Sequence, residues 1–307
     1  MKNKAKPFQS IDDQINLLKK RNLTINDDEI DKARSFLLNN NYYRISGYTL
    51  TLRSNDKFYD NATLDNVIQI YNCDKRMRHI ILSITEEIEI RIKTMVAYYH
   101  SKRYGALGYL DMNNFNCKTK GRIDADAVKE YLHITRKADT LKNMMTDTEA
   151  FLKHHKEEKD GLLPFWVYVE VLTISDISKL YSLLEYEIQL DIAKEFGYHH
   201  KSANNLLDNL LHSVTILRNI CAHGGRLYNR LFIRKPRLST QQKKLLRVNE
   251  NGNVVYDHLF SYILVLKDLS LGDDFSLLLE HLYELSDQYK FVDMKHYGFP
   301  DNWREIL

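Results

Sequence analysis

The chain has 307 residues, of which 44% are hydrophobic and 28% are charged, so it is long enough and apolar enough to build a sizeable core. Its formal net charge of +3 permits a nucleic-acid partner, but it excludes the strongly basic composition that would by itself indicate one. Glycine (11) and proline (4) are scarce, which argues against a turn-rich β architecture and favours helices.

The amino terminus and the cysteines bear on where the protein works. The basic segment 1–7 is followed by polar residues instead of an apolar run, so we expect no secretory signal peptide. No stretch approaches the roughly 20 apolar residues needed to span a bilayer, and we therefore expect no membrane partner. The three cysteines, Cys73, Cys117 and Cys221, are odd in number and lack the spacing of metal ligands. The sequence predicts a cytoplasmic protein with reduced thiols, no metal and no cofactor.

Helical patterns account for most of the predicted elements. Ser10 and Asp13 form a capping box that opens a short helix reaching Lys20. Apolar spacing predicts further helices over about 27–37, 63–103, 165–184, 202–222, 256–269 and 273–290, with shorter peripheral helices within 111–160. The segment 63–103 is either one very long helix or two helices separated by a kink. A turn is expected around Gly47, a short extended piece at 49–53, and a turn or small hairpin at 249–252. The sequence thus predicts an all-α fold with at most a small hairpin.

These elements suggest three parts of one compact unit: an N-terminal helical region over 1–62, a helical core over 63–237 and a C-terminal helical extension over 238–307. In the core, Pro164 occupies a position typical of a first helical turn, and Trp166 is expected to be buried. Gly224 and Gly225 are expected to end the 202–222 helix.

The end of that helix carries residues suited to acid–base chemistry on RNA. In Arg218-Asn-Ile-Cys-Ala-His223, an arginine is followed five positions later by a histidine. A metal-independent ribonuclease must take a proton from the ribose 2′-hydroxyl, return one to the 5′-oxygen and stabilise charge on the phosphate. Histidine titrates near neutral pH and suits the proton transfers, while arginine stays charged and matches phosphate oxygens. The Asn219 amide offers a group to orient the histidine or to bind the phosphate.

The spacing alone leaves a structural interpretation open. Five residues place His223 about 140° around the helix from Arg218, so the two side chains can converge only at a frayed helix end. A chain with 12 histidines is expected to contain such a pair by chance. A histidine favoured by the helix dipole and an arginine in an ordinary ion pair would explain the same residues.

Five segments in the same order resemble the Abi-like (abortive-infection) family, which includes the AbiD and AbiF phage-defence proteins. The segments are Asn41-Tyr-Tyr-Arg-Ile-Ser-Gly-Tyr48, Tyr71-Asn-Cys-Asp-Lys-Arg-Met-Arg78 with Ile88-Glu-Ile-Arg91, Pro164-Phe-Trp-Val-Tyr-Val-Glu170, Arg218-Asn-Ile-Cys-Ala-His-Gly-Gly-Arg-Leu-Tyr-Asn-Arg230 and Gly298-Phe-Pro-Asp-Asn-Trp303. The resemblance runs from about Pro7 to Trp303 and is more specific than one spacing. It favours the functional interpretation of Arg218 and His223.

The resemblance implies a HEPN-type helical bundle and a metal-independent endoribonuclease with Arg218, Asn219 and His223 in its active site. It also implies a toxin-like role in phage defence, a homodimer in which two Arg/His pairs share one cleft, and restraint by a small structured RNA that acts as an antitoxin. The sequence departs from the family pattern at Gly224, where members often carry a second histidine. No DNA partner is expected.

Other residues are candidates for RNA binding. They are the residues that follow the motif, Arg226, Tyr228, Arg230, Arg234, Lys235 and Arg237, together with Tyr43 and Arg44 near the amino terminus. A solvated basic loop and tyrosines that pin the first helices to the core are the structural alternatives. We interpret the pairs His154-His155 and His199-His200 as surface residues. Glu86, Glu87 and Glu89 are expected to form i, i+4 pairs with Arg91 and Lys93.

Two other functions stay open from the sequence. The first is a non-catalytic HEPN protein that holds a specific non-coding RNA as a sensor, without cleaving it. The second is a partner subunit controlled by a nucleotidyltransferase, for which Tyr228 would be the modified residue. Loss of cleavage in His223→Ala would separate the ribonuclease from both.

Overall fold

The computed structural model describes residues 7–119, 121–159 and 161–307. Most of the basic segment at the amino terminus, residues 1–6, lies outside the described residues. None of the helices in the described part of the chain combines the length and the apolar character needed to cross a lipid bilayer.

The described residues form an all-α fold, as predicted. The α-helices are α1 (Ile11–Lys20), α2 (Ile30–Asn40), α3 (Tyr42–Ser46), α4 (Leu64–Tyr104), α5 (Ala125–Met145), α6 (Ala150–Glu158), α7 (Phe165–Tyr168), α8 (Ile174–Leu183), α9 (Tyr186–Glu195), α10 (Ala203–Ala222), α11 (Thr240–Lys244), α12 (Leu259–Leu269), α13 (Gly272–Gln288) and α14 (Trp303–Ile306). Short 3-10 helices are η1 (Asp27–Glu29), η2 (Gly108–Leu110), η3 (Met112–Asn114), η4 (Val169–Val171) and η5 (Met294–Tyr297).

β structure in the described residues is confined to two antiparallel pairs of two-residue strands. Strand β1 (Arg53–Ser54) pairs with β2 (Lys57–Phe58), and β3 (Lys118–Thr119) pairs with β4 (Arg122–Ile123). The turn predicted at 249–252 lies between Val248 and Val254, which form a single antiparallel bridge.

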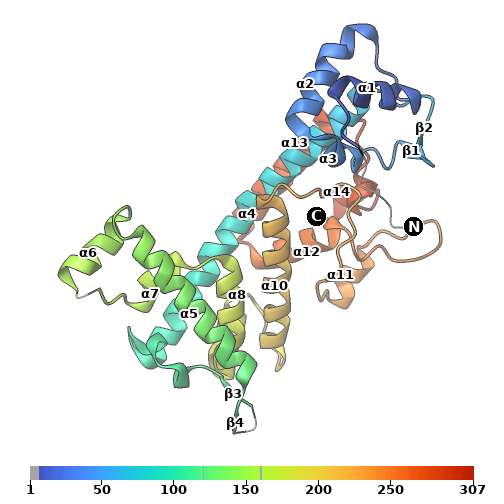
Figure 1. Ribbon diagram of the computed structural model, residues 1–307. Coiled ribbons are helices and arrows are strands. Elements are labelled where there is room, and N and C mark those ends of the chain that lie inside the picture. The colour runs from blue at the N-terminus through green and yellow to red at the C-terminus, as the bar shows by residue number, and fades with distance from the viewer. Residues whose placement is uncertain (1–6, 120, 160) are drawn as a thin grey trace.

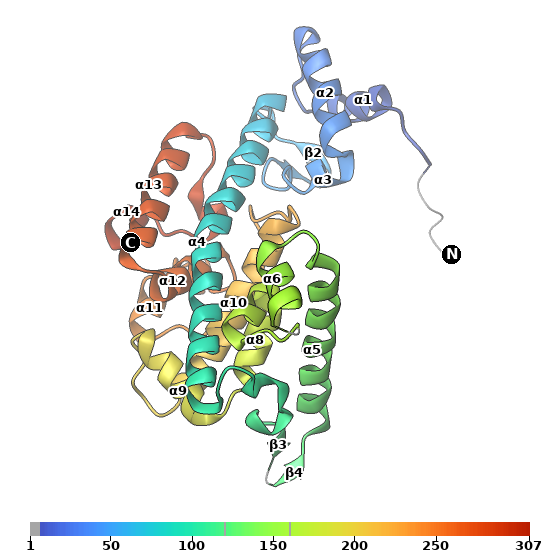
Figure 2. The same ribbon diagram turned by 90° about the vertical axis from the view of Figure 1, so that its left-hand side faces the viewer.

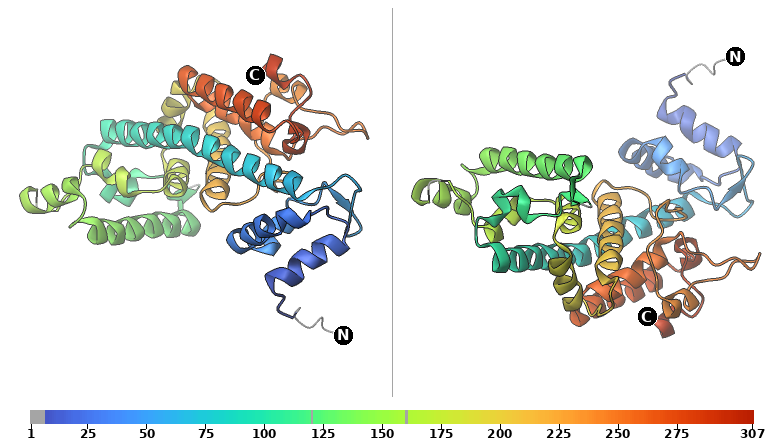
Figure 3. Two further views of the ribbon diagram at one scale, coloured as in Figure 1. Left: turned by 90° about the horizontal axis from the view of Figure 1, so that it is seen from above. Right: turned by 90° about the horizontal axis from the view of Figure 1, so that it is seen from below.

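Helix α4 is the axis of the molecule. Its 41 residues begin at a capping box formed by Thr63 and Asn66 and continue without a break, which selects one of the two predicted alternatives. Helices α1–α3 lie at one end of α4, whereas α5 and α6 lie toward the other end (Figures 1 and 3). Along its length α4 packs against α8, α9, α10 and α13. In Figure 2, α13 and α9 lie to the left of α4, and α8 and α10 to its right.

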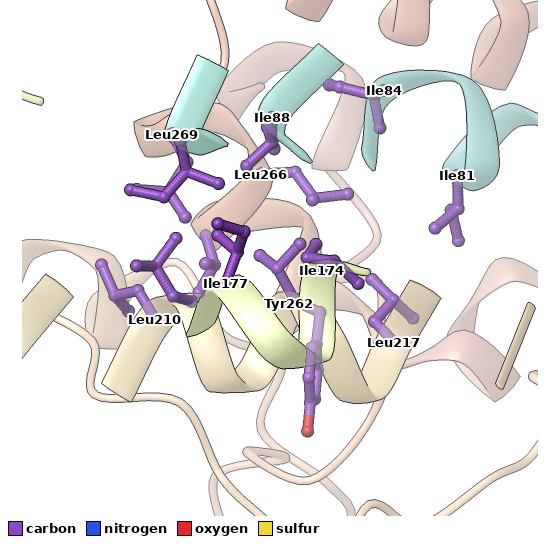
Figure 4. Packing of buried hydrophobic residues seen from close by; sticks show 14 of the residues in the cluster. Ile81, Ile84, Ile88, Ile174, Ile177, Leu210, Leu217, Tyr262, Leu266 and Leu269 are labelled. Atoms are coloured by element: carbon purple, nitrogen blue, oxygen red, sulfur yellow. The ribbon is translucent and has the colours of Figure 1, made fainter. Parts of the chain in front are cut away.

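The main core lies where α4, α8, α10 and α12 meet. Ile81, Ile84 and Ile88 of α4 face side chains of the other three helices across this core (Figure 4). A second, smaller cluster joins α1–α3 to the first turns of α4 and includes Ile15, Leu37 and Val67 in its interior. Helix α12 is buried on nearly all sides, which explains why its sequence is almost entirely apolar.

Some local predictions were wrong. The helix expected over 165–184 is broken into α7, η4 and α8, because Thr173 and Asp176 form a capping box that starts a new helix. Trp166 was expected in the core, but α7 is too short to bury all its faces and the tryptophan is 52% exposed. The turn predicted around Gly47 is present at residues 47–50, but the sequence missed the short helix α3 before it, whose N-cap is Asn41. Helix α5, in the region predicted to hold only short helices, has 21 residues.

Burial of His100 near the carboxyl end of α4 generates a prediction about stability and pH. Its ring is fully buried and stacks on Phe115, with 4.7 Å between ring centroids. Burial lowers the pKa of the imidazole from 6.5 to about 4. Between these two values the unfolded chain takes up a proton that the folded chain refuses, so stability falls as the pH falls.

We expect the free energy of unfolding of the wild type to drop by about 2 kcal/mol from this group between pH 7.5 and pH 5. His100→Phe should lose that part of the pH dependence, as measured by urea denaturation at the two pH values. His199→Phe, at an exposed histidine, is the control and should keep the wild-type dependence. A His100→Phe profile parallel to that of the wild type would contradict the prediction.

Candidate active site

His223 lies at the carboxyl end of α10, with its side chain exposed to solvent. Its backbone N–H donates to the carbonyl of Asn219 at 3.0 Å, which closes the last turn. Gly224 then takes a φ of +64°, and the Gly225 N–H donates to the Ile220 carbonyl at 2.7 Å. The helix therefore ends just before Gly224 and Gly225, as the sequence predicted. A residue in the left-handed conformation after the C-cap stops helical hydrogen bonding.

Arg218 is one turn earlier and points toward α4. Its side chain is 34% exposed and forms an ion pair with Glu89 of α4 at 3.7 Å and a hydrogen bond to the side-chain oxygen of Asn219 at 3.4 Å. Glu89 also pairs with Lys93 at 3.2 Å, which confirms that predicted pair. In the described part of the chain no hydrogen bond joins Arg218 to His223, in agreement with their separation of about 140° around the helix.

A buried carboxylate underlies the segment that follows His223. Asp74 of α4 is fully buried and accepts hydrogen bonds from four groups that come from three distant segments. The donors are the Tyr48 hydroxyl at 2.7 Å, the Leu227 N–H at 3.1 Å, the Tyr228 N–H at 2.7 Å and the Tyr297 hydroxyl at 3.2 Å. Arg78, one turn along α4, forms an ion pair with the same carboxylate. Sequence reasoning missed Asp74, although its place among the buried positions of α4 was a readable signal.

The electrostatics of Asp74 balance two large effects. Burial raises the pKa of its carboxyl group, whereas the Arg78 guanidinium and the hydrogen bonds from Tyr48, Leu227 and Tyr228 oppose that rise. All of these partners donate hydrogen bonds to Asp74. An ionised carboxylate can only accept hydrogen bonds, so this set of partners suits the charged form. The charge is thus paired and hydrogen-bonded, as a buried charge must be to persist.

A pocket of about 570 Å³ has Gly224, the residue after His223, in its wall. Its walls come from two segments that lie about 180 residues apart in the chain but meet beside α4: they are Tyr43, Arg44, Ser46, Gly47, Tyr48, Leu50 and Arg53 from the first, and Gly224, Gly225, Arg226 and Arg230 from the second. Four of these residues are arginines. The structure therefore brings together four of the predicted RNA-binding residues, Tyr43, Arg44, Arg226 and Arg230, and adds Arg53, which the sequence did not single out.

Two glycines allow the arginines to lie against the backbone. A Cβ atom at Gly47 would stand 3.1 Å from Nε of Arg226, and one at Gly224 would stand 3.0 Å from Nη2 of Arg44. Arg44 donates to the carbonyl of Gly224. A histidine at 224, as in the family pattern, would require both a strained backbone and a shift of Arg44.

The remaining predicted residues divide between surface and interior. Tyr43 is 86% exposed, whereas Tyr228 is only 3% exposed and its hydroxyl shares a hydrogen bond of 2.9 Å with Thr51. Burial thus removes the Tyr228 ring from the reach of an RNA or a modifying enzyme, which corrects its expected role. Lys235 pairs with Asp257 at 3.8 Å, and Arg234 is half-buried.

The described residues contain no cluster of histidine, cysteine or carboxylate side chains that could hold a metal ion. Of the two predicted surface pairs, His154, His199 and His200 are exposed, and His155 is half-buried with Nδ1 2.7 Å from the Phe151 carbonyl. Each of the three cysteines is buried, and none of them forms a disulfide.

Comparison with known protein families gives one match. A family model described as Abi-like protein matches residues 35–229, which is more than half of the chain and includes α4, the Arg218–His223 segment and every pocket-lining residue except Arg230. No curated protein and no solved structure matches the chain.

The Asp74 cluster predicts a large stability effect from a small substitution. Asp74→Asn removes the charge from a buried pair and leaves Arg78 without its counter-ion, so we expect the free energy of unfolding to fall by about 3–5 kcal/mol. Asp191→Asn removes one partner of the exposed Asp191–Lys194 pair and should cost less than about 1 kcal/mol. Urea denaturation of both variants measures the difference. Equal losses in the two variants would contradict the assignment of Asp74 as the central buried charge.

Proposed function

The chain belongs to the Abi-like protein family, and from this premise we propose that it is a metal-independent endoribonuclease with a HEPN-type site at Arg218 and His223. Membership of the family supports a role in abortive infection. The proposal adds the chemistry: cleavage of RNA that halts growth during phage infection, as a toxin does.

Each step of the proposed cleavage has a candidate group. The His223 imidazole accepts the proton of the ribose 2′-hydroxyl as the 2′-oxygen attacks phosphorus. The bond from phosphorus to the 5′-oxygen then breaks, and an imidazolium returns a proton to that oxygen. Arg218 stabilises the negative charge on the phosphate as it becomes five-coordinate. The products are a 2′,3′-cyclic phosphate and a 5′-hydroxyl.

One observation carries this proposal: the His223 imidazole is exposed at the end of α10, and the next residue, Gly224, lines a pocket whose walls include four arginines. An imidazole that handles protons on RNA must be reachable by the ribose, and RNA requires cations nearby. A buried histidine, or an acidic surface beside it, would have argued against the proposal.

The separation of Arg218 from His223 favours a site built by two chains. In one chain the two side chains diverge and Arg218 is turned toward Glu89. In a homodimer with the two α10 ends facing each other, the arginine of one protomer can serve the histidine of the other. We include in the proposal that a small structured RNA restrains this dimer by occupying the same cationic surface.

A second candidate is the non-catalytic protein that binds an RNA without cutting it. The engagement of Arg218 with Glu89 and Asn219, away from His223, is the observation that favours it. In that case the RNA should bind with the same affinity to wild type and to His223→Ala, and no cleavage should occur in either.

Cleavage of RNA in the presence of EDTA tests the proposed activity. The wild type should cleave and leave cyclic phosphate ends, and His223→Ala should be slower by about 10²–10⁴-fold, because it loses the general acid–base group. His199→Ala removes an exposed histidine remote from the motif and should cleave like the wild type. Cleavage that survives in His223→Ala, or that requires Mg²⁺, would refute the mechanism.

Mixing two inactive variants tests the composite site. Arg218→Ala and His223→Ala should each be inactive alone, but a mixed dimer contains one arginine and one histidine that can meet across the interface. We therefore expect activity to return on mixing, up to about half of the wild-type rate for each mixed dimer, or about a quarter of the wild-type rate for the whole sample when exchange of equal amounts is complete. Mixing His223→Ala with the double variant should restore nothing. If no activity returns although mixed dimers are detected by mass, each chain acts alone.

A further inference from the structure

The arginine pocket beside His223 contains donors that the chain does not satisfy. Nε of Arg53 and Nε of Arg230 are buried, and neither has a hydrogen-bond partner among the residues that the structure describes. A buried N–H without an acceptor is costly, and most such groups in folded proteins are paired. Both belong to residues that line the pocket, so this arginine-rich region is short of acceptors from the chain itself.

The charge of the pocket lining specifies the kind of acceptor. Four of its residues carry guanidinium groups, and its lining in the described part of the chain includes no carboxylate. Asp56 pairs with Arg53, but it is largely exposed and also pairs with Arg21 at 3.3 Å. Burial lowers the pKa of Arg226, against the opposing effect of the Asp74 carboxylate. An anion with several oxygens would match both the charge and the donors.

The arginines are already held in place for such a ligand. Arg44 donates to the carbonyl of Gly224, Arg226 donates to the carbonyls of Tyr228 and Asn229, and Arg230 donates to the carbonyl of Arg226 at 3.3 Å. Each guanidinium has five N–H groups, so these bonds fix its position and leave others to face the pocket. Little side-chain ordering remains to oppose binding.

The size and the rim of the pocket indicate a ligand larger than a single inorganic ion. The volume of about 570 Å³ falls in the range of about 300–1,000 Å³ that is typical of pockets for small organic ligands. Tyr43 stands at the rim with 86% of its surface exposed, and Leu50 beside it is 47% exposed. An exposed tyrosine next to a phosphate site offers a face on which a base can stack.

We propose that the pocket formed by Arg44, Arg53, Arg226 and Arg230 binds a phosphate group of the RNA other than the one that is cleaved, with the attached base on Tyr43. Gly224, in the pocket wall, directly follows His223, so a phosphate held here places a neighbouring linkage at the imidazole. The proposal rests on the proposed function for its ligand, RNA. In this proposal the pocket positions the RNA strand and takes no part in the proton transfers.

Binding of an RNA that cannot be cleaved tests the pocket apart from catalysis. The probe is a fluorescent 2′-O-methyl octanucleotide, which lacks the attacking hydroxyl, measured by anisotropy against the full chain. Leu50→Glu places a carboxylate at the pocket rim and should weaken binding by about 10-fold or more, whereas Leu50→Gln, of the same size and uncharged, should weaken it far less. Because Leu50 is exposed, both variants should fold, which thermal denaturation checks.

Salt dependence provides a second measurement. The double variant Arg53→Gln/Arg230→Gln should reduce the slope of log affinity against log salt concentration by about one for each lost phosphate contact. Arg34→Gln, at an arginine on α2 that pairs with Asp12 and Asp31, removes one charge outside the pocket and should leave the slope unchanged. Equal binding by wild type, Leu50→Glu and the double variant would overturn the proposal.

The source of the phosphate is resolved by two forms of the probe. An octanucleotide without a terminal phosphate reports internal linkages, and the same probe with a 5′-phosphate reports strand ends. If the pocket variants weaken both forms equally, the ligand is an internal phosphodiester; if they weaken only the 5′-phosphorylated form, the ligand is a terminal phosphate. Both results support a phosphate site.

Failure of this proposal and failure of the proposed function give different results. If wild type cleaves RNA while Leu50→Glu and Leu50→Gln bind and cleave alike, the ribonuclease stands and the pocket assignment falls. If wild type does not cleave but Leu50→Glu alone weakens binding of the octanucleotide, the pocket assignment stands without the nuclease.

Discussion

The buried charge of Asp74 is the interaction on which the site depends. Its carboxylate joins four pieces of chain that are remote in sequence: the end of the 42–48 segment through Tyr48, helix α4 itself, the loop after α10 through Leu227 and Tyr228, and η5 through Tyr297. Backbone N–H groups of a loop cannot stay buried without acceptors, and here one carboxylate accepts two of them. The loop that carries Arg226 and Arg230 is thereby fixed to the helix that organises the fold.

Helix α4 also sets the position of the other end of the motif. Asp74 and Glu89 lie 15 residues apart on it, or about 22 Å along the axis of a continuous helix. The first holds the loop that follows His223, and the second holds Arg218 near the end of α10. A single continuous helix therefore holds both the Arg218 side chain before His223 and the loop at 227–228 after it. A kink within α4, which the sequence had left open, would have uncoupled them.

The sequence predicted the features that depend on neighbouring residues, such as helix caps and helix ends. It missed the features that depend on contacts between distant segments. The capping box at Ser10, the unbroken apolar face of α4 and the stop at Gly224 depend on neighbours within a few residues, and all three are present in the structure. The break before α8 had a readable signal in Thr173 and Asp176, but it was hidden within an apolar run. Residues such as Asp74 and Arg53 gain their roles from groups more than 150 residues away or from a shared pocket, and no local pattern reports those contacts.

The family resemblance acquires a physical meaning from this arrangement. Tyr48, Asp74 and Tyr228 come from three of the segments that carry it, and they meet in one hydrogen-bonded cluster at the amino-terminal half of α4. The segment that begins at Pro164 instead packs at the far end, where Phe165 lies against His100 and Tyr109. Most of the characteristic residues therefore hold the arginine pocket and the α10 end in register, while His223 is the exposed group that this framework presents. The signature thus includes the residues that build this framework: the buried carboxylate of Asp74 with its partner Arg78, and the two glycines, Gly47 and Gly224, against which Arg226 and Arg44 lie.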